Sequence, residues 1–243
     1  MIISHRYRYV FVEVPRTGST AIAAELEKYY DGERVHRKHA YYSTFLRHAS
    51  REEKQYRVFS GIRNPLDDAV SRFRKLSTKD ADYYEKDRRN IRRRDYIREA
   101  NASFSDFLHK FHRWPFDLWT STYHRQFDVI IRFEDIQAGF AEAIDMIGAD
   151  LVRPLPVVNK TDRGRDFESY YTEDDIAKAV WIFGPYMKAW GYEFPAEWDN
   201  PQVPFSSRAL YRLLQPPRQF YWNHVRQGEW MGARAFRKAF LED

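Results

Sequence analysis

The sequence predicts an α/β protein in which a parallel sheet is flanked by helices and followed by a helical C-terminal extension. Three short segments are rich in aromatic and β-branched residues, as buried strands are, and each is followed by apolar residues at helical spacing. A repeated strand–helix order is typical of a parallel sheet. Hydrophobic residues make up 43% of the 243 residues and aromatic residues 17%, which is enough for a core and excludes a disordered or collagen-like chain.

Each predicted strand stops at a residue type that ends strands. We expect strands over residues 7–14, 56–62 and 127–133, which stop at Pro15, at Arg63-Asn64-Pro65 and at Glu134-Asp135. The second helix has a clear start, because Asn64 can cap it and Pro65 suits the first helical position. The residues at helical spacing after the three strands are Ile22, Leu26 and Tyr29; Leu66, Val70 and Phe73; and Phe140, Ile144 and Ile147, the last set ending at Gly148.

A later helix is predicted from Thr172 to Gly191. Asp175 stands three residues after Thr172, which is the spacing of a capping box. Its predicted buried face comprises Ile176, Val180, Phe183, Met187 and Trp190.

The remaining segments are predicted to be helical and peripheral. Residues 79–98 mix acidic with many basic residues, which favours a solvated helix over a binding arm. Residues 205–240 are aromatic and basic, and we expect a helical appendage that packs on the domain or on a partner. The chain is thus divided into a domain over residues 1–195 and an extension over residues 196–243, and the extension could mediate a homodimer.

The composition of the chain excludes cysteine-based sites and indicates which partners are to be expected. The chain has no cysteine, so a disulfide scaffold, a thiolate metal site and a cysteine nucleophile are excluded, and no clustered metal spacing is present, so no metal is expected. A net charge of +5 favours anionic partners but is too mild to indicate nucleic-acid binding. No stretch approaches the ~20 apolar residues of a membrane span. The N-terminus has no apolar signal core, so we expect a soluble cytoplasmic protein.

The first strand runs directly into a small-residue turn, PRTGST (residues 15–20), and then into a helix. Exposed backbone N–H groups and the positive helix end favour an anion at such a turn. Gly18 lets the backbone approach an anion closely, and Arg16 adds a fixed positive charge. Hydroxyl donors come from Thr17, Ser19 and Thr20. The turn is P-loop-like in position, but it lacks the Gly-Lys pair of GxxxxGK[ST], which argues against a magnesium-dependent ATPase or kinase. An ordinary tight turn would also explain this loop taken alone.

A second turn of interest follows the second strand, in RNPLDDAVSRF (residues 63–73). Arg63 stands at the C-terminal end of that strand, where ligands bind in open α/β sheets. Ser71 lies two turns into the next helix. An arginine fork and a hydroxyl together suit a phosphate. A salt bridge for Arg63 and a surface position for Ser71 would be the purely structural interpretation.

Taken in order, PRTGST and RNPLDDAVSRF resemble the two cofactor-binding signatures of the PAPS-dependent sulfotransferases, where PAPS is 3′-phosphoadenosine 5′-phosphosulfate. The pattern is most similar to the Golgi-type carbohydrate sulfotransferases and their bacterial relatives. Further similar segments extend the resemblance over residues 7–194: FDVIIRFEDI, Leu155-Pro156, Asn159-Lys160-Thr161, Tyr170-Tyr171-Thr172-Glu173 and Trp190-Gly191-Tyr192.

The resemblance implies a P-loop-like sheet that binds PAPS and releases PAP, adenosine 3′,5′-bisphosphate. It assigns the 3′-phosphate to Arg63 and Ser71, and Lys160 or Arg163 could close over the nucleotide. Two positions depart from the family, which most often has lysine in place of Arg16 and often has arginine in place of Asp68. Arginine keeps the positive charge but is bulkier and forked. The residues assigned to the 5′ side are Arg16, Thr17, Gly18, Ser19 and Thr20.

The resemblance also implies transfer of a sulfuryl group from PAPS to a hydroxyl of a carbohydrate or glycoconjugate. Arg16 would neutralise charge on the departing phosphate, and a general base would take the acceptor proton. We expect His39 to be that base, because it lies between the two motifs, where many relatives carry a catalytic histidine, and because its unperturbed pKa of about 6.5 suits the task. Lys38 could aid the sulfonate charge. His36 and Glu13 remain alternatives, as does a basic surface patch without a catalytic histidine.

Two other functions stay open from the sequence. One is a protein that binds PAP or PAPS without transferring the group, and the other is a nucleotide-dependent phosphotransferase. The acceptor would be recognised by residues 40–55, residues 77–125 and the C-terminal extension. Their Tyr, Trp and Arg content suits sugar stacking or an anionic acceptor, and it equally suits ordinary packing.

Overall fold

The computed structural model describes residues 1–78, 88–118, 121–124, 126–156 and 166–225. The chain forms two compact units, each assembled from several segments. The first unit comprises residues 1–63, 118–158 and 214–243, and the second comprises residues 64–117 and 159–213. The division at residue 195 that we expected from the sequence stays a prediction.

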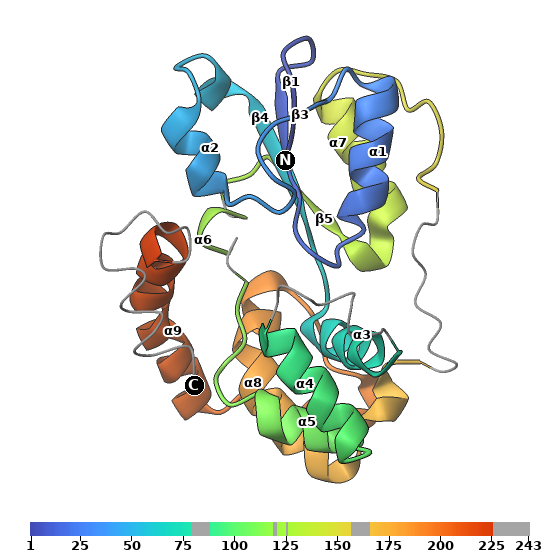
Figure 1. The fold of residues 1–243 in the computed structure, drawn as a ribbon, viewed down its shortest axis with the longest axis vertical. Coiled ribbons are helices and arrows are strands. Elements are labelled where there is room, and N and C mark those ends of the chain that lie inside the picture. Colours follow the sequence, from blue (N-terminus) through green and yellow to red (C-terminus); the bar gives the residue numbers. More distant parts are fainter. Residues whose placement is uncertain (79–87, 119–120, 125, 157–165, 226–243) are drawn as a thin grey trace. The chain divides into compact units, whose positions relative to one another are not determined.

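The first unit is built on a five-stranded mixed sheet with the strand order β3-β1-β2-β4-β5 (Figure 1). Strands β2, β4 and β5 are parallel, whereas β1 runs antiparallel to both β2 and β3. The three parallel strands are the three predicted from the sequence, so the α/β class with a largely parallel core is confirmed. The strands are β1 (Ile2–Ser4), β2 (Tyr9–Val12), β3 (Glu33–Arg34), β4 (Arg57–Ile62) and β5 (Val129–Arg132).

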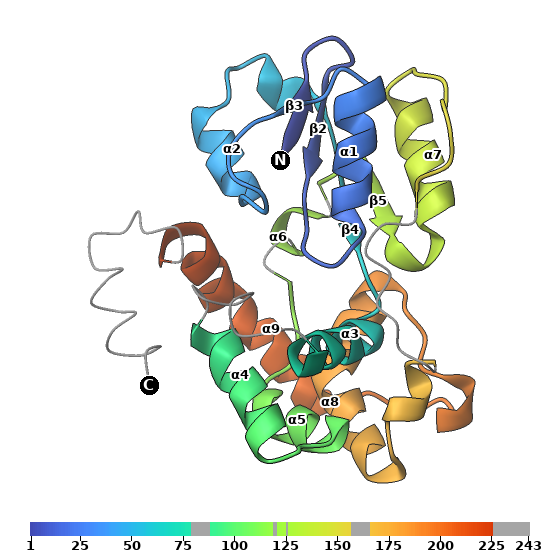
Figure 2. The same cartoon turned by 45° about the vertical axis from the view of Figure 1, so that its right-hand side comes forward.

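Both faces of this sheet are buried, because alternate residues of each strand enter different cores. Tyr9 and Phe11 of β2 pack in one cluster with residues of α1 and α7, and Val10 and Val12 pack in another with residues of α2. Figures 1 and 2 show α1 and α7 side by side on one face of the sheet and α2 on the other. The helices of this unit are α1 (Ser19–Tyr29), α2 (Tyr42–His48), α6 (Ser121–His124) and α7 (Ile136–Met146).

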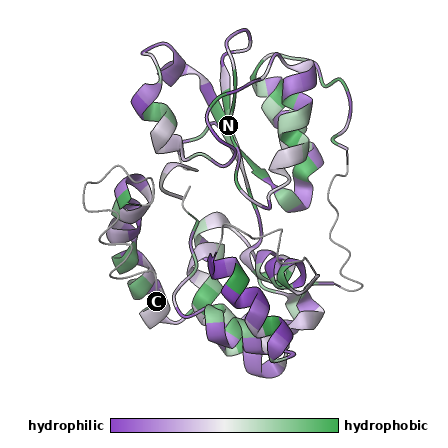
Figure 3. Ribbon diagram, in the orientation of Figure 1, coloured by the Kyte–Doolittle hydropathy of each residue, from purple (hydrophilic) through white to green (hydrophobic). Residues whose placement is uncertain are grey.

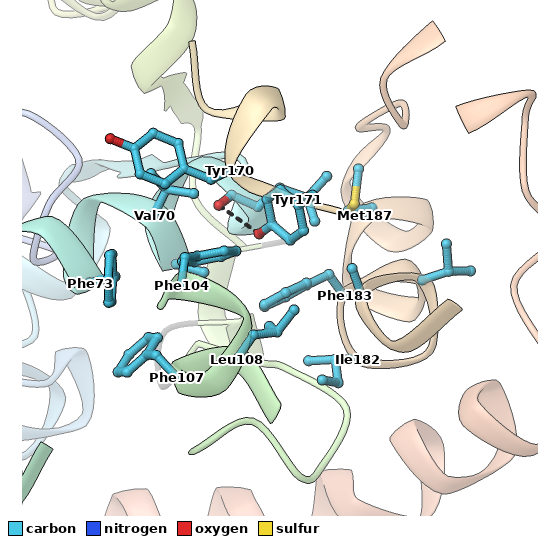
Figure 4. Close-up of a cluster of buried hydrophobic side chains, with 14 of the residues drawn as sticks. Val70, Phe73, Phe104, Phe107, Leu108, Tyr170, Tyr171, Ile182, Phe183 and Met187 are labelled. Atoms are coloured by element: carbon cyan, nitrogen blue, oxygen red, sulfur yellow. Dashed lines mark hydrogen bonds between the residues drawn. The ribbon is translucent and has the colours of Figure 1, made fainter. Parts of the chain in front are cut away.

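The second unit is a helical assembly around an aromatic core (Figure 4). Phe73, Phe104 and Phe107 form edge-on and tilted ring contacts within this core. The hydroxyl of Tyr171 donates a buried hydrogen bond to the carbonyl of Leu66 at 3.0 Å. The helices that begin in this unit are α3 (Pro65–Thr78), α4 (Arg88–Glu99), α5 (Phe104–Phe111), α8 (Glu173–Trp190) and α9 (Phe205–Phe220).

Several predicted helix ends are confirmed. The side chain of Asn64 caps α3, since its Oδ1 accepts the N–H of Leu66 at 3.0 Å. Helix α8 has the predicted capping box at its start and Gly191 at its end. Short 3₁₀ segments occur at Glu53–Gln55, Phe133–Asp135, Glu168–Tyr170 and Ala196–Trp198, and a π-helical segment occurs at Tyr221–Val225.

The two peripheral segments are helical where the structure describes them. Helix α4 covers the second half of the charged run; Ile97 is its buried residue, and Figure 3 shows the helix as largely hydrophilic. The predicted appendage forms α9, while residues 79–87 and 226–243 lie outside the described residues. Within the described ranges, no helix combines the length and the apolar character that a membrane crossing requires.

Asp175 joins α8 to α5 inside the second unit. Its carboxylate is fully buried, and Oδ2 accepts hydrogen bonds from the backbone N–H and the hydroxyl of Thr172 at 3.0 and 2.9 Å. The other oxygen, Oδ1, accepts a hydrogen bond from the Ser105 hydroxyl at 2.7 Å and lies 3.1 Å from Nε2 of His109. One carboxylate therefore caps α8 and holds α5 against it.

Replacing Asp175 with alanine should lower the free energy of unfolding by about 1–3 kcal/mol, because the change removes a helix cap and leaves the partly buried donors of Thr172 and Ser105 without their acceptor. Urea denaturation measures this loss. Asp106→Ala is the matched control, since Asp106 forms the capping box of α5 with Ser103 but is exposed to water. The control should lose clearly less stability, and equal losses would contradict the bridging role of Asp175.

Candidate functional site

The loop between β2 and α1 turns the chain sharply from the end of a strand into the start of a helix. Two of its residues have a positive φ, Arg16 at 65° and Gly18 at 74°. Gly18 stands at the N-cap of α1, and a Cβ at this position would overlap Ile136 of α7. The first N–H groups of a helix lie outside its internal hydrogen bonds, and the positive helix end attracts anions. The loop therefore presents backbone donors where the sequence predicted an anion.

Thr17 has a structural role in this loop. It is buried, and its hydroxyl donates a hydrogen bond to the carbonyl of Val14 at 2.9 Å. It packs directly on Gly61 of β4, where a Cβ would lie only 2.6 Å from Oγ1 of Thr17. Of the three hydroxyls proposed as donors, that of Thr17 thus donates within the loop itself, while the residue packs against the neighbouring strand.

Arg63 reaches from the end of β4 to the same loop. Its side chain is buried, and Nη1 donates a hydrogen bond to the carbonyl of Arg16 at 3.0 Å. The guanidinium also lies 4.1 Å from the centre of the Phe133 ring, at the end of β5. Because β2, β4 and β5 are parallel neighbours, the ends of all three strands meet at this edge of the sheet. The structure therefore brings together Arg63 and the first loop.

The segment that carries His39 lies beside this loop as well. Nδ1 of His39 lies 3.0 Å from the backbone carbonyl of Glu13, and Nζ of Lys38 donates to the hydroxyl of Thr20 at 2.9 Å. A carbonyl can only accept, so Nδ1 carries the proton and Nε2 is the nitrogen that can accept one. Burial lowers the pKa of His39, and the Lys38 charge lowers it further, against the opposing effect of the Glu13 carbonyl. The imidazole is therefore neutral near pH 7.

The other two candidate bases have different surroundings. The carboxylate of Glu13 is fully buried; its Oε2 forms ion pairs with the amino group of Met1 and, at 2.8 Å, with Arg34. His36 is exposed, and its ring lies 5.9 Å from that of His48. Partial desolvation of the ring and the neighbouring His48 lower the pKa of His36. Of the two histidines, His39 is the one whose ring is held by a hydrogen bond at the end of β2, next to the loop.

The remaining predicted site residues belong to the second unit or lie outside the described residues. Ser71 and Asp68 belong to the second unit, where both are buried along α3. Asp68 and Asp67 occupy the first turn of α3, where the positive helix end stabilises carboxylates. Lys160 and Arg163 lie outside the described residues.

Two residues that shape this site were not identified from the sequence. Phe133 supplies the ring beneath Arg63, and its position at the end of a predicted parallel strand was the available signal. Gly61 allows Thr17 to approach β4, and a glycine inside a strand pattern often marks such a close backbone approach.

Comparison of this chain with protein-family models, with curated proteins and with solved structures gives no match. Among the residues that the structure describes, no group of three or more His, Cys, Asp or Glu side chains could hold a metal ion. The function therefore has to be argued from the geometry of the loop and its neighbours.

Gly61→Ala should displace the loop and lower the free energy of unfolding by about 1–3 kcal/mol, since the added methyl group would collide with Thr17. Chemical denaturation measures the effect. Gly148→Ala, in the same unit, is the control: it has φ of 72° and no atom within 4 Å of the new Cβ, so it adds backbone strain without a collision. A double variant with Thr17→Gly should recover part of the loss at Gly61, and strict additivity would contradict the proposed contact.

Proposed function

We propose that this chain is a PAPS-dependent sulfotransferase that acts on a hydroxyl of a carbohydrate or glycoconjugate. The observation that carries the proposal is the hydrogen bond from the buried Arg63 guanidinium to the carbonyl of Arg16. It links the two motifs that resemble the sulfotransferase signatures, although they are far apart in the sequence. An isolated surface salt bridge at Arg63 would not have produced this contact.

The residues of the first unit fit a phosphate-containing nucleotide. The N-terminus of α1 and the positive-φ turn at Arg16 and Gly18 supply backbone donors and a positive field. Arg63 adds a buried cation beside this turn. These features support the assignment of the 5′ side of PAPS to the loop and of the 3′-phosphate to Arg63. Ser71, Lys160 and Arg163 remain predicted partners of the nucleotide.

Sulfuryl transfer requires little more than alignment and charge stabilisation from the protein. Bound PAPS would supply the sulfuryl group and a good leaving group. A new bond forms between the acceptor oxygen and sulfur while the bond from sulfur to the 5′-phosphate oxygen breaks. The acceptor proton passes to Nε2 of His39, and the guanidinium of Arg16 offsets the negative charge on the departing phosphate. Lys38, held by Thr20 next to the loop, could stabilise the sulfonate oxygens.

The surroundings of His39 suit a general base. The bond to the Glu13 carbonyl fixes the tautomer with Nε2 unprotonated, and burial lowers the pKa so that this form predominates at neutral pH. Glu13 is less suited, because its carboxylate is buried in ion pairs with Arg34 and Met1. These contacts favour His39 over Glu13 as the base.

Arg63→Ala should weaken PAP binding about 10- to 100-fold, because the change removes a charge-assisted contact worth about 1.5–3 kcal/mol. Isothermal titration calorimetry with PAP measures the affinity. Arg57→Ala is the matched control: Arg57 lies at the opposite end of the same strand and pairs with Asp128 at an exposed site. Equal PAP affinity in the two variants would show that Arg63 does not contact PAP.

The same titration distinguishes the phosphotransferase alternative. Tighter binding of magnesium-ATP than of PAP by the unsubstituted protein would support a phosphotransferase instead.

His39→Ala should reduce turnover by about 10²–10⁴-fold and leave PAP affinity nearly unchanged. Release of PAP from PAPS in the presence of a panel of sugars measures turnover, and His36→Ala serves as the control. In the unsubstituted protein the rate should hold as the pH falls through the range where an ordinary histidine becomes protonated and should decline only at lower pH, because the base must be neutral and its pKa is lowered. Normal turnover of His39→Ala would move the base to another residue. Tight PAP binding without turnover on any acceptor would favour the non-catalytic binding protein.

A further inference from the structure

One face of α9 carries an apolar stripe that is open to solvent. Among the described residues, six large hydrophobic side chains are exposed, and three of them lie on this helix: Phe205 at 76%, Leu213 at 72% and Phe220 at 53%. Ala209 and Pro216 are exposed between them. At about 100° per residue these five positions fall within about 80° of arc, so they form one continuous stripe.

The opposite face of α9 is the one that packs on the protein. Ser207 is fully buried, and its hydroxyl donates a hydrogen bond to the carbonyl of Trp181 in α8. Beyond the other end of the helix, Val225 is buried and Arg47 contacts the carbonyl of Asn223 at 3.4 Å. The stripe thus lies on the side of α9 away from Ser207.

The charge of α9 is of one sign. The helix contains Arg208, Arg212 and Arg218 and no acidic residue. Arg212 is exposed at the edge of the stripe, and the guanidinium of Arg208 lies 6.0 Å from the centre of the Phe205 ring. An apolar stripe on a helix whose charged residues are all cations complements a surface that is apolar inside and anionic at its edge.

We propose that α9 is an interfacial helix that binds the surface of a membrane containing anionic lipids. Phe205, Leu213 and Phe220 enter the boundary between headgroups and acyl chains, while Arg212 pairs with lipid phosphates and carboxylates. The helix lies in the plane of the surface and does not cross it. The proposal is independent of the nucleotide site.

A second copy of the chain fits the stripe less well. The middle of the stripe lies at Arg212 and Leu213, so an antiparallel pairing of two stripes would place the two Arg212 side chains next to each other. Pro216 and Pro217 also have no N–H to offer the carbonyls of Arg212 and Leu213. Those carbonyls would be buried in a dry helix–helix contact, whereas the headgroup region supplies water. A lipid surface therefore fits the stripe better than a second copy does, because it offers anions to Arg212 and water to the two carbonyls.

Flotation of the full chain with lipid vesicles tests the proposal. The protein should bind phosphatidylcholine vesicles that contain about 30% phosphatidylserine far better than phosphatidylcholine alone, and added salt should weaken that binding. The triple variant Phe205→Ser, Leu213→Ser, Phe220→Ser should bind the anionic vesicles at least about thirtyfold more weakly. Arg212→Glu should bind them about five- to tenfold more weakly and should change little on phosphatidylcholine.

The chain offers a matched control in its other three exposed large hydrophobics. The triple variant Trp114→Ser, Leu151→Ser, Val152→Ser removes a similar exposed apolar surface outside α9 and should bind as the unsubstituted protein does. Urea midpoints close to that of the unsubstituted protein show that both triple variants fold. Equal loss in both triple variants, or no binding to anionic vesicles, would overturn the proposal. So would a dimer, measured by light scattering, that the α9 variant dissociates while vesicle binding is unchanged.

Discussion

The hydrogen bond between Arg63 and the carbonyl of Arg16 is the interaction on which the candidate site depends. A non-glycine residue at positive φ, such as Arg16, costs about 1–2 kcal/mol and needs support from its surroundings. Here the support comes from two neighbouring strands: Arg63 at the end of β4 holds the carbonyl, Phe133 at the end of β5 lies under the guanidinium, and Thr17 packs on Gly61 of β4. The loop is therefore fixed by the sheet before any ligand arrives, so little ordering entropy would be lost on binding.

The charges around this loop are arranged to favour an anion. Arg16, Lys38 and Arg63 lie at or beside the N-terminus of α1, whose own dipole is positive at that end. The carboxylate of Glu13, two residues before Pro15, is buried and offset by Arg34 and Met1, so it does not cancel their field. The carbonyl of the same residue holds His39 in a defined tautomer. Glu13 thus contributes to the site through its backbone, while its side chain stabilises the antiparallel edge of the sheet.

The sequence revealed the framework of the fold because its signals were local. The three parallel strands, the cap at Asn64 and the capping box of Thr172 with Asp175 all follow from residues close together in the chain. Strands β1 and β3 were missed, since three and two residues are too short to show alternation. The contacts of Phe133 and Gly61 depend on strand order, which a single sequence does not contain. The strands and helices could therefore be predicted from the spacing of apolar residues. The side-chain contacts of the site could not, because they form between strands whose order in the sheet is known only from the structure.

The structure also accounts for arginine at a position where lysine would be expected from the resemblance. The hydroxyl of Thr17 donates within the loop to the carbonyl of Val14, whereas that of Thr20 accepts from Lys38 and keeps its own proton to donate. Under the proposed function, backbone N–H groups, cationic side chains and the hydroxyl of Thr20 would act together on an anion. The backbone of Arg16 is set by Arg63 through its carbonyl, independently of the side chain at position 16. Only a positive charge is then required of that side chain, and both arginine and lysine provide one. The forked guanidinium can contact two oxygens of one phosphate, which a lysine cannot match in geometry. Under the proposed function, arginine at position 16 would hold the departing phosphate differently from lysine, while the backbone of the loop would be unchanged.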